Sequence, residues 1–88
     1  MDKATYLALL EPAMQLVVKK HEDYNTGISL HDYFPFADKS YIQMLHIKVL
    51  RLRALEGKTA NFEGAKDTLL DLINYSIFYL QYLEGKQK

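Results

Sequence analysis

Residues 62–84 read FEGAKDTLLDLINYSIFYLQYLE, and this stretch decides the fold class. Its apolar residues recur at three- and four-residue steps, which predicts one long helix that ends at Gly85. A polar stripe follows one face of this helix at steps of four, four and three: Glu63, Asp67, Asp71 and Asn74. Buried carboxylates are costly unless they are paired or bound, so this stripe is where we look for function.

The length and composition point to one small domain that is completed by self-association. The chain has 88 residues, which is one domain over 1–88, and it contains no cysteine that could form a disulfide or a thiolate metal site. A chain this short buries little of its surface, yet 49% of its residues are hydrophobic. Both observations favour a homo-oligomer.

The charge balance excludes several partner classes. Eleven acidic residues match eleven basic ones, whereas a nucleic-acid-binding module should be basic. The N-terminus has no long apolar core of a signal peptide, and no stretch approaches the roughly 18 apolar residues of a membrane span. We therefore expect a cytoplasmic protein with no nucleic-acid or membrane partner.

Two further helices are predicted before residue 62. Periodic apolar residues indicate a helix over 3–22, in which Pro12 either produces a kink or marks a later start near Glu11. A second helix over 38–56, or from 39, should end at Gly57. Its apolar residues lie nearly all the way round, so we expect it to be buried, central and at a subunit interface. Asn61 is a plausible N-cap for the last helix.

The segment 23–38 connects the first two helices and is rich in aromatic residues. Its glycine and proline predict a loop, and its rings include Tyr24, Tyr33, Phe34 and Phe36. Such a loop packs on the body of the domain, on a second subunit or around a ligand. The whole pattern predicts an all-α fold, a three-helix antiparallel bundle completed by homo-oligomerisation.

A basic pair on the second helix complements the acidic stripe. Lys48 and Arg51 are three residues apart and therefore share a face. An arginine fork and a lysine point charge suit a phosphate group, although snorkelling side chains over apolar surface would give the same pattern. The carboxylates could hold Mg²⁺, position these cations, or form a structural network.

No resident metal or cofactor is predicted by the remaining motifs. The three histidines are scattered and form no helical pair, and without cysteine a closed zinc site is not expected. The sequence contains neither a glycine-rich phosphate loop nor the Ser-His-Asp pattern of a serine hydrolase. Tyr24, which follows the first helix beside the aromatic loop, could stack on a base.

Three motifs resemble the nucleotide-modification-associated domain family, which is small, all-α and common in phages. They cover most of the chain from Val17 to Leu83: Lys20-x-x-Asp23-Tyr24, then Ile47-Lys48-x-x-Arg51-x-x-x-Leu55, and Glu63-x-x-x-Asp67-Thr68-Leu69-x-Asp71-Leu72-x-Asn74-Tyr75. The family is in turn similar to MazG-type nucleotide pyrophosphatases, which hold Mg²⁺ and a triphosphate between acidic motifs on adjacent helices. Here only the last helix supplies such acids.

The resemblance and the residues together favour an oligomeric nucleotide-binding protein without catalytic residues. Lys48 and Arg51, with Lys20, would contact phosphate, and Tyr24 with Tyr33, Phe34 or Phe36 would stack on a base. The expected ligand-binding residues are Lys20, Asp23, Tyr24, Lys48, Arg51, Asp67, Asp71 and Asn74. The phage character of the resemblance suggests an anti-defence role in the host cytoplasm, namely sequestration of a nucleotide immune signal.

Two other interpretations stay open from the sequence. One is a Mg²⁺-dependent nucleotide phosphohydrolase of MazG-like type, which would use Glu63, Asp67 and Asp71 as metal ligands. The other is a structural or interaction protein, in which the polar stripes form an interfacial ion network.

Overall fold

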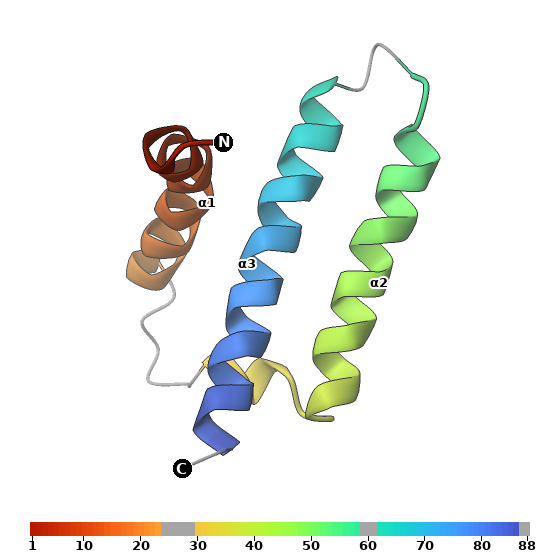
Figure 1. Ribbon diagram of the computed structural model, residues 1–88. Helices are drawn as coiled ribbons and strands as arrows, with labels where there is room; N and C mark the ends of the chain where they lie inside the picture. Colours follow the sequence, from red (N-terminus) through yellow and green to blue (C-terminus); the bar gives the residue numbers. More distant parts are fainter. Residues whose placement is uncertain (24–29, 59–61, 87–88) are drawn as a thin grey trace.

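Three α-helices make up most of the structure. The computed structural model describes residues 1–23, 30–58 and 62–86. In chain order it contains α1 (Lys3–Asp23), a short 3-10 helix η1 (Leu30–Tyr33), α2 (Asp38–Leu55) and α3 (Phe62–Lys86), as Figure 1 shows. No strand occurs in these ranges, so the all-α prediction with three helices is confirmed.

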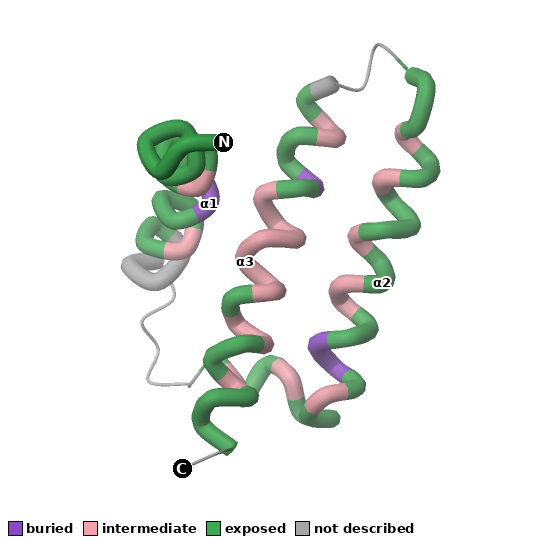
Figure 2. Tube along the Cα trace, in the orientation of Figure 1, coloured by how far each residue is buried: buried purple, intermediate pink, exposed green. Residues whose placement is uncertain are grey.

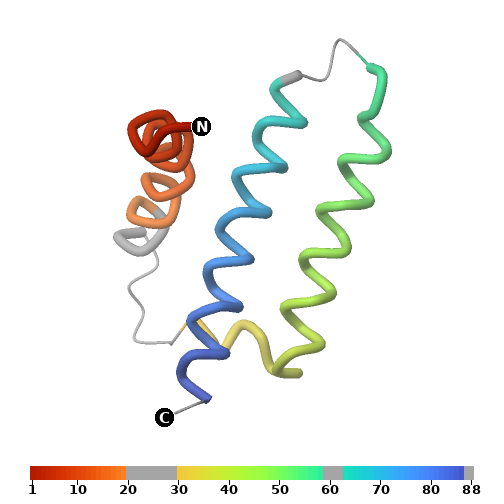
Figure 3. Tube along the Cα trace, in the orientation of Figure 1, coloured from red at the N-terminus to blue at the C-terminus, as the bar shows by residue number. Residues whose placement is uncertain are grey.

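The helix α3 occupies the centre of the fold. It packs along α2 in the opposite chain direction, while α1 lies on its other side and crosses it steeply (Figure 1). Figure 3 follows the chain by colour and shows η1 and the start of α2 beside the end of α3. The expectation that the helix over 38–56 is the central one was therefore wrong, and the antiparallel arrangement applies to α2 and α3.

The ends of α1 and α2 follow local sequence signals. The Asp2 carboxylate accepts a hydrogen bond from the Thr5 backbone N–H at 2.8 Å, so α1 begins there and a start near Glu11 is wrong. Pro12 lies inside the helix. At the end of α2, Gly57 has a φ of 75°, which confirms the predicted stop. The predicted N-cap Asn61 lies outside the described residues.

The end of α3 differs from the prediction because of tertiary contacts. The helix continues through Gly85 to Lys86, two residues beyond its predicted end. The Lys86 ammonium lies 3.4 Å from a carboxylate oxygen of Asp38 and 5.0 Å from the centroid of the Tyr82 ring. These contacts with α2 and with the preceding turn hold the last residues of α3 in helical form.

Stacked aromatic rings form the core between α2 and α3. Tyr41 is completely buried, with the ring of Phe34 stacked at 4.3 Å and that of Tyr79 at 5.2 Å between centroids. The hydroxyl of Tyr41 hydrogen-bonds to Nδ1 of His31 in η1. His31 and Phe34 of the aromatic loop thus pack on the body of the domain.

Burial outside this core is sparse. In α2 only Ser40 and Tyr41 are buried, whereas Ile42 and Ile47 remain 53% and 44% exposed. Figure 2 shows the exposed outer surface of α2 and an almost fully exposed α1. The prediction of an all-round buried second helix is therefore wrong for the single chain. No helix in the described ranges combines the length and apolar character needed to cross a membrane.

Candidate functional site

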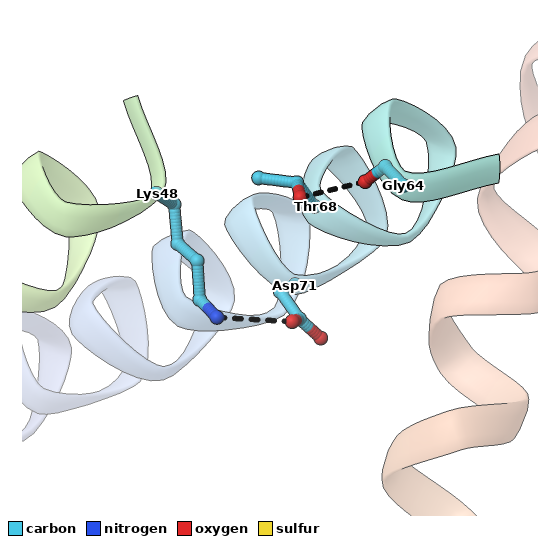
Figure 4. Close-up of polar contacts among 4 residues, drawn as sticks. All are labelled: Lys48, Gly64, Thr68 and Asp71. Atoms are coloured by element: carbon cyan, nitrogen blue, oxygen red, sulfur yellow. Dashed lines mark hydrogen bonds and ion pairs between the residues drawn. The ribbon is translucent and has the colours of Figure 1, made fainter. Parts of the chain in front are cut away.

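An ion pair between Lys48 and Asp71 joins α2 to α3. Lys48 Nζ lies 3.1 Å from Oδ2 of Asp71, as Figure 4 shows. The side chains are 15% and 34% exposed, respectively. A lysine this far from solvent needs a partner to remain charged at low cost. The predicted meeting of the acidic and basic stripes thus occurs at this one pair.

The helical turn before Asp71 is fixed by Thr68. Its side chain is 2% exposed, and its hydroxyl donates a hydrogen bond of 2.7 Å to the Gly64 carbonyl (Figure 4). Because Thr68 is held at the contact with α2, the carboxylate three residues later faces Lys48. Sequence analysis did not assign this role to Thr68, since a threonine inside a helix carries no specific signal.

The outer members of the two stripes point to solvent. Arg51, Glu63 and Asp67 are all exposed. Among the described residues, ion pairs occur at Lys48–Asp71 and at Lys86–Asp38. The fold therefore brings one predicted cation and one predicted carboxylate together, and leaves Arg51 and Asp67 at the rim of the same helix pair.

Asn74 joins two helices. Its amide nitrogen donates a hydrogen bond of 3.0 Å to the carbonyl of Ala13, which is fully buried on α1. Asn74 thus fixes α1 against α3, a role that only the tertiary structure reveals. The other predicted site residues lie elsewhere: Lys20 and Asp23 are in the last turns of α1, where side chains are not described, and Tyr24 lies outside the described residues.

The described carboxylates are dispersed along the helices rather than gathered into one group. Across residues 1–23, 30–58 and 62–86 there is no group of three or more histidine, cysteine or acidic side chains arranged to hold a metal ion. Asp71 is instead engaged with Lys48, and Glu63 and Asp67 face solvent on the same helix. A Mg²⁺ ion requires several oxygen ligands in nearly octahedral geometry.

An open aromatic pocket of about 330 Å³ lies next to the ion pair. Eight residues line it: Tyr33, Phe34, Pro35, Phe36, Ser40, Gln43, Met44 and Tyr75. The ring of Tyr75 connects the two features, because its centroid lies 5.8 Å from Lys48 Nζ. Tyr75 thus lies between the pocket and the cation, and it links the two features along α3.

The structure distinguishes the three loop aromatic residues that the sequence offered as alternative stacking partners for a base. Phe34 stacks on Tyr41 in the core. Tyr33 and Phe36 line the pocket and remain 58% and 74% exposed, so their ring faces are available to a ligand. The backbone N–H of Phe36 donates to Oγ of Ser40 at 2.9 Å, which holds this turn against α2.

Sequence analysis missed three of the pocket residues on α2: Ser40, Gln43 and Met44. A usable signal was present, since Ser40, Met44 and Lys48 follow one another at steps of four. This row lies on the face of α2 that carries Lys48, and it leads along the helix toward the aromatic residues at 33–36. The apolar residues around the whole helix obscured the row, because no polar face stood out.

A second polar cluster lies where α2 begins and α3 ends. Burial raises the pKa of the Tyr79 phenol, and the carboxylate of Asp38 adds to this rise. A hydrogen bond with the Tyr82 hydroxyl, followed by the charge of Asp38, raises the pKa of Lys86. These groups stabilise one another across the helix ends, and this accounts for the order of the last turn of α3.

Comparison with known families agrees with the motif analysis. The family model described as nucleotide modification associated domain 1 matches residues 20–83. The matched range contains the Lys48–Asp71 pair, the aromatic pocket and every predicted ligand-binding residue. No curated protein and no solved structure matches the chain.

Proposed function

This chain belongs to the nucleotide modification associated domain 1 family, and on that premise we propose that it binds a phosphate-bearing nucleotide at the joined pocket and ion pair. The observation that carries the proposal is the position of Tyr75, which lines the aromatic pocket and also lies against Lys48. A nucleotide needs both an aromatic surface and a cation, at a short separation.

The phosphate would be held by Lys48. Its ammonium is largely withdrawn from solvent, and in a site with reduced screening a cation attracts an anion more strongly than it does in water. Asp71 fixes the ammonium in place, and it leaves donor capacity on Lys48 because an ammonium carries three N–H groups. The exposed Arg51, one turn further along α2, would add a second cation at the rim.

The base would stack in the pocket beside Tyr33 and Phe36. Stacking on an aromatic side chain contributes about 1–3 kcal/mol per base, and both rings have exposed faces. Gln43 in the pocket wall offers an amide that can donate to and accept from a base edge. Asp67, exposed one turn before Asp71, would reach ribose hydroxyls.

Retention of an intact ligand is the use that we propose for this site. The described carboxylates form no cluster suited to a metal, and a binder that does not turn its ligand over lowers the free concentration of that ligand. For a phage-encoded chain of this kind, the consequence is sequestration of a nucleotide signal in the host cytoplasm.

The first experiment tests binding and turnover together. The protein is incubated with a panel of linear nucleotides, cyclic nucleotides and ADP-ribose derivatives in Mg²⁺, and free ligand is followed by mass spectrometry before and after heat denaturation. We expect one ligand to be depleted and then released intact. Release as products would instead support a phosphohydrolase, and depletion of none would support a structural protein.

Matched variants then locate the ligand. Lys48→Gln should weaken binding about 10- to 150-fold, because a charge-assisted hydrogen bond contributes about 1.5–3 kcal/mol. Phe36→Ala should weaken it about 5- to 150-fold through the lost stacking. Arg53→Gln removes an exposed cation from the same helix and should leave affinity unchanged. Equal losses in all three variants would contradict this location.

A further inference from the structure

The single chain exposes far more surface than a compact protein of its size. Its accessible area is 7138 Å², whereas a folded monomer of 10.2 kDa is expected to expose about 5,300 Å². Its radius of gyration is 14.6 Å, against about 12 Å for a compact domain of this length. The excess of roughly 1,800 Å² lies within the range that one partner buries in an obligate dimer, about 1,000–2,500 Å².

The helix α1 contributes a large apolar part of this surface. Over residues 3–19, where burial is described, Ala13 alone is buried, and between Ala4 and Val18 the only charged residue is Glu11. Six large apolar side chains of α1 are at least one-third exposed: Tyr6, Leu7, Leu9, Met14, Leu16 and Val18. A helix with this composition belongs in an interior, and Figure 2 shows most of its described part exposed.

A second apolar stripe runs along α3 on the side turned away from α2. Leu69, Ile73, Ile77 and Leu80 follow one another at steps of four, four and three. The three residues Leu69, Ile77 and Leu80 are 48%, 50% and 55% exposed. On the same helix, α2 occupies the face that carries Thr68, Asp71 and Tyr79, so α2 does not cover the exposed residues of the stripe.

We propose that a second copy of this chain covers the apolar surface of α1 and the α3 stripe. Only four of the described residues are buried, which leaves the isolated domain with too little core to be stable alone. The partner must therefore be present whenever the chain is folded, and a copy of the chain meets that condition without any other protein. The arrangement is a two-fold dimer in which the same surface of each copy is buried.

The Lys48–Asp71 pair and the aromatic pocket lie on the α2 side of α3, so this interface does not depend on a ligand. Sedimentation equilibrium of the wild-type protein over a wide concentration range is the first test. We expect a mass of about twice 10.2 kDa. A folded monomer at every concentration would overturn the proposal.

Charge substitutions test which face of the chain is buried in the dimer. Ile77→Glu should raise the dimer dissociation constant at least about 100-fold, because each dimer loses two buried apolar contacts and gains two buried charges. Ile42→Glu is the control, since Ile42 is similarly exposed, at 53%, but lies on α2. Equal effects of the two substitutions, with helical content retained, would overturn the assignment of the face.

The absence of cysteine allows a test that leaves the apolar surface nearly intact. A single spin label at Ile77→Cys or at Arg53→Cys gives one label per chain, so any dipolar signal comes from the second copy. We expect a shorter inter-label distance at position 77 than at position 53. The reverse order would overturn the proposed face even if the protein is dimeric.

Discussion

The Lys48–Asp71 ion pair gives the sharpest test of how the two central helices are held together. The pair is intermediate in burial, at 15% and 34% exposed side chain, and its atoms are 3.1 Å apart. Exposed pairs contribute about 0–1 kcal/mol, while removal of one partner of a buried pair costs about 3–5 kcal/mol. For a pair of this intermediate burial we expect Asp71→Asn to lower the free energy of unfolding by about 1–2 kcal/mol.

The expected loss can be measured as a melting temperature. With an unfolding entropy of about 2.1 cal/mol/K per residue over 88 residues, a loss of 1–2 kcal/mol lowers Tm by about 5–10 °C. Calorimetry at one fixed protein concentration avoids a shift caused by dimer dissociation. A double-mutant cycle of Asp71→Asn with Lys48→Met isolates the pair, because methionine retains an apolar chain without the charge.

The exposed pair Lys86–Asp38 is the matched control for this cycle. Its atoms are 3.4 Å apart and its side chains are 51% and 44% exposed. We expect a coupling energy of about 0–0.5 kcal/mol that disappears in 1 M salt, whereas most of the Lys48–Asp71 coupling should persist. A Lys48–Asp71 coupling below about 0.3 kcal/mol, or one as sensitive to salt as the control, would refute the reasoning.

Three further predictions concern stability and pH. Gly64→Ala should raise the free energy of unfolding by about 0.5–1 kcal/mol in denaturant titrations, since the added Cβ would lie at an ordinary 3.5 Å from the nearest atom of α2; a loss of stability would contradict this. Asn74→Ala should cost about 1 kcal/mol and speed amide hydrogen exchange in α1, because the hydrogen bond to the Ala13 carbonyl is lost. Burial raises the pKa of Tyr41 above its ordinary value, so the phenol ionises at a lower pH in the unfolded chain than in the folded one. The contribution of Tyr41 to stability is therefore complete below about pH 10 and should fall as the pH rises beyond it. Thermal melts between pH 8 and 11 should show a smaller fall in the Tyr41→Phe variant.

Local signals in the sequence determined the helices. The apolar periodicity of residues 62–84, the stop at Gly57 and the long helix before residue 23 follow from backbone preferences within a few residues, and the structure has each of them. The meeting of Lys48 with Asp71 was also predictable, because a carboxylate stripe and a lysine on neighbouring helices lower their electrostatic energy by pairing. Helical period and charge are properties of short segments, so they can be read without the fold.

Only the tertiary structure decided which apolar surfaces are buried. The sequence favoured the second helix as the centre, but α3 takes that place because it offers one face to α2 and another to α1. Likewise, Phe34 stacks on the buried Tyr41 while Tyr33 and Phe36 stay mostly exposed at the pocket, and Lys86 continues α3 because Asp38 lies within reach. Each of these outcomes is a competition among contacts between residues distant in the sequence, and a local pattern carries no information about which contact wins.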